Sequence, residues 1–168
     1  MEASIGEMLV GILVQFQIGE FEYTGENPLH HEPVNLSELP LMEKAREWGI
    51  SVKMVSFSRC KCPGYYDKGC QEIQLISADS KTFLHGLAHA ALERLSDPTT
   101  HTQPQLQEII AELAAAALHQ IIVKTPDEKL SNSYSLILFN AGALDKTPLE
   151  ACLEVFSETV EIIKYLLR

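Results

Sequence analysis

One stretch of this 168-residue chain combines helix-forming residues with two regularly spaced histidines. Residues 82–95 are rich in leucine, alanine and phenylalanine, so we expect a helix that is apolar on most sides and buried. His85 and His89 are four residues apart, and side chains at positions i and i+4 share one face of a helix. Two imidazoles in this arrangement can reach the same metal ion. The stretch therefore predicts a buried helix that carries part of a metal site.

The same residues resemble the His-Glu-x-x-His signature of the zincin metallopeptidases, with one departure at Gly86. In that signature the two histidines hold Zn²⁺ and the glutamate is the general base. The resemblance implies that this chain keeps the metal ligands and lacks the base, whose loss costs about a hundredfold to ten-thousandfold in rate. Glycine also makes a helix about 1 kcal/mol less stable than alanine does, and helix packing gives no evident reason for it here.

A second helix is predicted over residues 104–124, where alanine and leucine dominate. Pro104 suits the first turn of a helix, and Thr102 is a candidate cap before it. Glu108 and Glu112 lie one turn apart on one face, beside small residues that permit close helix packing. The pair is either a solvated acidic edge or a carboxylate pair that meets a cation.

The His-x-x-x-His helix followed by a Glu-x-x-Ala-Glu helix resembles the ImmA/IrrE and ArdC-like branch of the gluzincins. The resemblance covers roughly residues 39–168, and the other stretches that carry it are 64–66, 72–75, 81–83, 132–134 and 151–153. It implies that Glu108 is the third zinc ligand and that Glu112 orients one of the histidines. It also implies that the stretches at 64–66 and 72–75 form a strand pair leading into the metal helix.

The expected fold is α+β and zincin-like, with a small mixed sheet of about three strands packed on the metal-binding helix and two to three further helices. Residues 50–57 alternate between apolar and polar, which predicts a strand with one buried face. Residues 70–76 predict another strand, with Ile73 and Leu75 on one face. In the zincin arrangement an edge strand lies beside the metal cleft and can pair with an extended peptide.

Local signals set the ends of the remaining elements. Ser77, or Asp79 with Ser80, is expected to cap the metal helix. A short helix over residues 41–48 is expected to end at Gly49. Further helices are predicted over 131–139, capped by Ser131 or Asn132 and ending near Gly142, and over 149–167 at the C-terminal end.

The first 38 residues are treated as a segment and loop of uncertain structure, separate from a zincin-like domain over residues 39–168. Residues 8–18 fit either a buried strand or an amphipathic helix, and their β-branched and aromatic content favours extended structure. This segment is a candidate cover for a sheet edge or a contact between copies of the chain. Proline, glycine and asparagine predict a loop over 24–40.

Other residues with reactive or metal-ligating side chains allow both a structural and a functional interpretation. Tyr134 is either a packed tyrosine or a stabiliser of an oxyanion near the metal. Cys60, Cys62 and Cys70 form an incomplete ligand set, so free thiols in a loop are favoured over a structural metal. Solvent-facing loop positions are expected for His30, His31 and His101.

Charge and hydropathy exclude several classes of function. The net charge is −10 and the chain contains no basic run, which argues against direct binding of nucleic acid. The apolar run over residues 8–16 is too short to span a bilayer, and no secretion signal is evident. We therefore expect a cytoplasmic protein with reduced cysteines and no membrane contact.

These features lead to two hypotheses about function. The first is a zinc metallopeptidase-like protein that acts on or binds a peptide or protein partner and is inactive or crippled because Gly86 replaces the base. The second is a non-catalytic regulatory or adaptor protein, of the kind linked to antirestriction or mobile elements. Gly86 itself fits a natural pseudoenzyme, an altered copy of an active enzyme, or rescue by another carboxylate such as Glu112 or Glu93.

Overall fold

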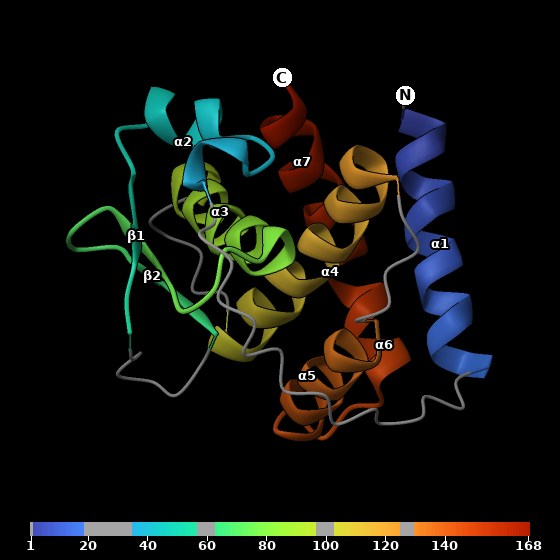
Figure 1. Ribbon diagram of the computed structural model, residues 1–168. Coiled ribbons are helices and arrows are strands. Elements are labelled where there is room, and N and C mark those ends of the chain that lie inside the picture. The colour runs from blue at the N-terminus through green and yellow to red at the C-terminus, as the bar shows by residue number, and fades with distance from the viewer. Residues whose placement is uncertain (1, 19–34, 57–62, 97–102, 125–129) are drawn as a thin grey trace.

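The computed structural model describes residues 2–18, 35–56, 63–96, 103–124 and 130–168 (Figure 1). Within these residues the chain forms seven α-helices, one 3-10 turn and one three-stranded mixed sheet, which confirms the α+β class. In chain order the elements are α1 Glu2–Ile18, η1 Leu36–Glu38, α2 Met42–Glu47, β1 Ser51–Met54, β2 Gly64–Asp67, β3 Glu72–Leu75, α3 Ser80–Leu95, α4 Pro104–Val123, α5 Leu130–Gly142, α6 Pro148–Glu154 and α7 Phe156–Leu167.

The sheet has the order β1-β3-β2, with β3 parallel to β1 and antiparallel to β2. The expected strand pair before the metal helix is therefore present as β2 and β3. Ile73 and Leu75 are both buried on β3, as the alternation predicted. The strand predicted over residues 50–57 is shorter in the structure, and its apolar face is only partly covered, since Val52 packs against the core but Met54 is exposed.

Helices cover the sheet in successive layers (Figure 1). α3 packs on β2 and β3, and α4 packs along α3 on the side away from the sheet. α5 and α7 contact α4 in turn, and α1 lies at the far side of the molecule from the sheet. The expected number of further helices was thus too low, because six helices accompany α3 in the described residues.

The central helix is α4, and its sequence explains its place. Residues 109–118 are all buried, and four of them are consecutive alanines, which allow neighbouring helices to approach closely. α4 is long and apolar enough to cross a membrane, but more than half of its most apolar stretch is buried within the fold. We interpret α4 as the core helix of this domain. Its N-cap is Gln103, without a side-chain hydrogen bond, and the expected cap Thr102 lies outside the described residues.

The preference for extended structure near the N-terminus was wrong, because residues 2–18 form α1. The buried side chains of α1 recur three to four residues apart, which is helical spacing. They are Ile5, Leu9, Ile12, Leu13 and Phe16. They pack against α4, α6 and α7 and belong to the same hydrophobic core as the rest of the molecule, so α1 covers helices rather than a sheet edge.

The single terminal helix expected over residues 149–167 is two helices. Val155 leaves helical geometry, with φ −96° and ψ 5°, and separates α6 from α7. The side chain of Thr159 donates a hydrogen bond to the carbonyl of Val155, a contact four residues back that bends helices. α5 also begins one residue before its expected caps, at Leu130, and it ends at Gly142 as predicted.

Candidate metal centre

Two neighbouring helices bring the sequence-predicted ligands together. α3 is capped by Asp79, whose carboxylate accepts a hydrogen bond from the Thr82 backbone, so the helix begins one turn before His85. His85 and His89 then lie on the same face of α3, with ring centroids 4.8 Å apart. Glu108, in the N-terminal part of α4, faces both rings.

The three donor groups form a compact triangle. The Nε2 atoms of His85 and His89 are 3.1 Å apart, and the Glu108 carboxylate lies 3.4 Å from the first and 3.3 Å from the second. Ligand atoms that surround a tetrahedral zinc ion at its usual bond lengths are about 3.3 Å from one another. In the described part of the chain this is the one group of three or more such side chains able to hold a metal ion.

Glu112 fixes the proton on His85. Its Oε2 lies 2.8 Å from His85 Nδ1, and a carboxylate only accepts, so Nδ1 carries the hydrogen and donates it. A neutral His85 then has a bare Nε2 lone pair, which points at His89 and at the Glu108 carboxylate. The two Nε2 atoms and the Glu108 carboxylate therefore face one point, where a cation or a shared proton can hold them together. This arrangement matches the role that the resemblance implied for Glu112.

A buried lysine and a serine complete the surroundings of Glu112, and the sequence analysis missed both. Ser133 on α5 donates its hydroxyl hydrogen to Glu112 Oε1 at 2.6 Å. Lys81 Nζ donates to Ser133 and lies 3.5 Å from the same carboxylate oxygen. One signal was available, because Lys81 stands four residues before His85 and therefore shares its helix face. Lys81 is a charged residue within a largely apolar stretch on that face, which makes it a candidate member of the site.

The carboxylates control the protonation of the triangle. Burial alone would lower the pKa of His85, but hydrogen bonds to Glu108 and Glu112 outweigh it and raise the pKa to about 9. Hydrogen bonds from His85 and His89 hold the pKa of Glu108 well below its usual range. Burial works against ionisation of Glu112, but His85, Lys81 and Ser133 together keep its pKa low. Without a metal, a proton on His85 therefore takes the place of the cation.

The triangle is open to solvent on one side. About a fifth of each histidine side chain is accessible, 20% for His85 and 19% for His89, whereas 42% of the Glu108 side chain is accessible. Glu112, behind His85, is almost fully buried. A further ligand can therefore approach from the side of Glu108, while the side of Glu112 is closed by protein.

Gly86 lies in a close packing contact that the sequence did not reveal. Gly86 is buried against β3, and a Cβ atom built on it lies 3.2 Å from Ile73 Cγ2 and 3.4 Å from two further atoms of the same side chain. The shortest of these distances is tighter than nine in ten Cβ contacts in proteins, so Ile73 must shift by a few tenths of an ångström to admit a side chain at position 86. Helix α3 thus approaches the central strand through a glycine.

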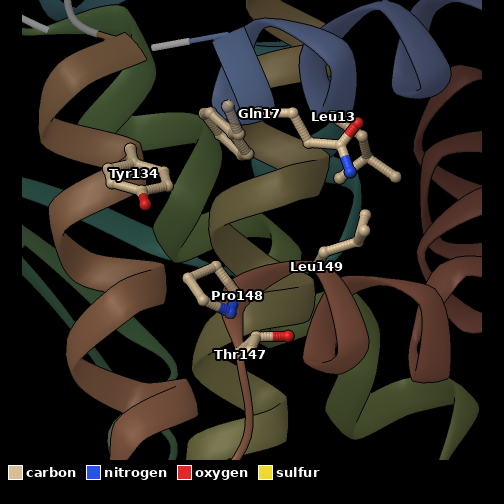
Figure 2. Close-up of a pocket in the computed structure, with 7 residues that line it drawn as sticks. Leu13, Gln17, Tyr134, Thr147, Pro148 and Leu149 are labelled. Atoms are coloured by element: carbon tan, nitrogen blue, oxygen red, sulfur yellow. The ribbon is translucent and has the colours of Figure 1, made fainter. Parts of the chain in front are cut away.

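Tyr134 lies away from the triangle, in a small cavity on the other side of α5 (Figure 2). Its ring contacts Phe16 of α1 with a centroid distance of 5.4 Å. The cavity holds about 200 Å³, and its wall also includes Leu13, Gln17, Thr147, Pro148 and Leu149. This position agrees with the packed reading of Tyr134, whereas its neighbour Ser133 faces Glu112.

Two further candidates within the described residues, Glu93 and Cys70, do not join the site. Glu93 accepts hydrogen bonds from Tyr66 and Gln71 at the far end of α3. Cys70 is an exposed free thiol, and burial raises the pKa of Cys152 to about 12. The other predicted candidates lie outside the described residues: His30, His31, Cys60, Cys62 and His101.

Comparison of the chain with protein-family models, with curated proteins and with solved structures gives no match.

Proposed function

We propose that this protein binds one Zn²⁺ ion through His85, His89 and Glu108, in a zincin-like fold whose peptidase chemistry is disabled. The observation that carries the proposal is the triangle of two Nε2 atoms and one carboxylate, with edges of 3.1 to 3.4 Å. Nitrogen and carboxylate donors suit zinc, and a carboxylate behind one histidine is the usual way in which proteins orient such a ligand. Glu112 supplies that carboxylate.

Support for the zincin-like arrangement comes from the order of the elements. A small mixed sheet packs on α3, which carries both histidines, and the next helix supplies the acidic ligand. A bound zinc ion acts as a Lewis acid that polarises an oxygen of its ligand. This chain holds the ion and orients His85, but no carboxylate follows His85 to accept a proton, because Gly86 stands there under Ile73.

Metal content tests the proposal directly. The purified chain, supplied with zinc, is expected to hold one zinc per chain by elemental analysis, and His89→Ala or Glu108→Ala is expected to lose it. His119→Ala is the matched control, because His119 lies on α4 outside the triangle and its removal is expected to leave the zinc in place. A wild-type chain that takes up no transition metal after zinc addition contradicts the proposal.

The packing of Ile73 on Gly86 favours the non-catalytic reading, in which the metal site serves to bind a peptide or protein partner. The test is to restore the missing base together with room for it. Gly86→Glu combined with Ile73→Ala is expected to gain peptidase activity on a mixed peptide substrate, whereas the wild-type chain and Ile73→Ala alone are expected to show none. Wild-type peptidase activity that is lost with His89→Ala would overturn the non-catalytic reading.

A further inference from the structure

Behind the metal triangle, the buried side chain of Lys81 faces the buried carboxylate of Glu112, which is an unusual arrangement of charges. The side chains of Lys81 and Glu112 are only 7% and 9% exposed, and Lys81 Nζ lies 3.5 Å from Glu112 Oε1. Ser133 holds both groups, since it accepts a hydrogen bond from Lys81 and donates one to Glu112. Three helices therefore fix this pair in place.

The pair changes the net charge at the site. Two neutral imidazoles and the Glu108 carboxylate leave a divalent ion with a net charge of +1. Glu112 alone would cancel that charge, but the positive charge of Lys81 cancels Glu112 instead. The position after His85 adds no carboxylate, because Gly86 and Ile73 occupy that side. The charges of the ion and of these described side chains therefore sum to +1, in surroundings from which water is partly excluded and where charges interact more strongly than in bulk water.

We propose that the open position of the metal site binds a carboxylate anion, and that Lys81 is the positioning residue whose charge gives the site this preference. The inference rests on the proposed function, since the anion binds to the metal-loaded site. Access is available on the side of Glu108, whose side chain is 42% exposed. Both a small carboxylic acid and the free C-terminus of a peptide carry the required group.

The test uses the full chain loaded with Co²⁺, whose visible absorption reports changes in metal coordination. Sodium acetate is titrated at constant ionic strength, and a saturable spectral change is expected. Lys81→Gln keeps a hydrogen-bond donor but removes the charge, and it is expected to weaken acetate binding about tenfold, as loss of one nearby charge predicts. Lys53→Gln is the matched control, because Lys53 lies on the exposed edge strand β1 and pairs with Glu72 of β3. This variant is expected to leave acetate affinity unchanged.

Two further variants separate charge from structure. Ser133→Ala removes a hydrogen bond and keeps the charge of Lys81, so acetate affinity is expected to stay within about twofold of wild type, a change far smaller than loss of a charge produces. Glu112→Gln makes the site more positive, so acetate is expected to bind more tightly when Co²⁺ is saturating. Structural damage would weaken acetate binding in all three variants. The opposite signs of Lys81→Gln and Glu112→Gln therefore keep the test valid if one variant folds poorly.

The source of the carboxylate is tested with N-acetyl-dialanine against its C-terminal amide. Tighter binding of the free acid than of both the amide and acetate identifies a peptide C-terminus, and equal binding of the free acid and acetate identifies a small acid; both support the inference. If Co²⁺ binds but acetate leaves the spectrum unchanged, or if Lys81→Gln behaves like Lys53→Gln, the inference is overturned and the metal site stands. If Co²⁺ does not bind, the proposed function fails, and the inference fails with it.

Discussion

Ile73 on the central strand lies against Gly86 on the metal helix so closely that one added methyl group would stand 3.2 Å from its Cγ2 atom. This contact links the distance between helix α3 and the sheet to the kind of residue that can follow His85. The zincin signature that the sequence resembles has a glutamate at that position, where it serves as the general base. Here the position is used for packing.

Gly86→Ala is expected to leave stability unchanged or lower it, although alanine favours a helix by about 1 kcal/mol over glycine. The gain is offset because overpacking a buried contact costs about 1 to 3 kcal/mol. Gly11→Ala is the matched control, since Gly11 lies within α1 with nothing within 4 Å of an added Cβ, and it is expected to stabilise the protein. Urea denaturation of both variants measures the difference.

A double-mutant cycle checks the cause. Ile73→Ala removes all three side-chain atoms that an added Cβ would approach, so Gly86→Ala is expected to be more favourable in the Ile73→Ala background than in the wild type. If Gly86→Ala stabilises the wild-type chain as much as Gly11→Ala does, then the close contact has no energetic consequence and the packing argument for Gly86 is wrong.

The metal-free protein is expected to lose stability as the pH rises from 6.5 to 9. The pKa of His85 is raised from 6.5 to about 9 in the fold, so its protonated form stabilises the folded state fully below pH 6.5 and less and less up to pH 9. Zinc competes with that proton, so zinc affinity is expected to increase over the same range. Denaturation with a chelator and zinc titration at three pH values test these opposite trends. A metal-free stability that is constant over this range contradicts the raised pKa.

Glu112→Gln is expected to weaken zinc binding by about 10- to 100-fold, the usual effect of removing a group that orients a metal ligand. The amide can still accept a hydrogen bond from His85, but it lacks the negative charge. Glu93→Gln, on α3 but bonded to Tyr66 instead, is the control and is expected to bind zinc as the wild type does. Competition with a coloured chelator gives both affinities; equal values would rule out a role for Glu112.

Asp79→Ala is expected to destabilise the fold by about 1 kcal/mol, because Asp79 caps α3 through the Thr82 backbone. The sequence left Ser77 as an alternative cap, and Ser77→Ala is expected to have little effect, since Ser77 is exposed and outside the helix. Thermal unfolding followed by circular dichroism compares the two. A larger loss with Ser77→Ala than with Asp79→Ala would show that the cap has been wrongly assigned.

The sequence predicted the parts of the site that follow from helical spacing. His85 and His89 had to share a face once residues 82–95 formed a helix, and the cap at Asp79 and the strand residues Ile73 and Leu75 also follow local rules. The roles of Glu108 and Glu112 are expectations from a family resemblance; the structure brings Glu108 to both histidines and Glu112 to His85.

What the sequence could not provide depends on contacts between distant elements. Lys81 and Ser133 are 52 residues apart and meet only because α3 and α5 both pack on α4. Ile73 meets Gly86 through the distance between helix and sheet, which no local pattern encodes. The N-terminal helix was missed because a short apolar run fits a strand as well as a helix until its partners, here α4, α6 and α7, are known.

The burial of ten consecutive residues in α4 has a consequence for how the proposed site would acquire an ion. The helix that carries Glu108 and Glu112 is held by its neighbours along half its length, so the donor atoms are in place before any ion arrives. Loading then requires no refolding, and a chelator should strip the ion while the domain stays intact and ready to be reloaded. This behaviour distinguishes a preorganised receptor from small zinc domains that unfold when their metal is removed.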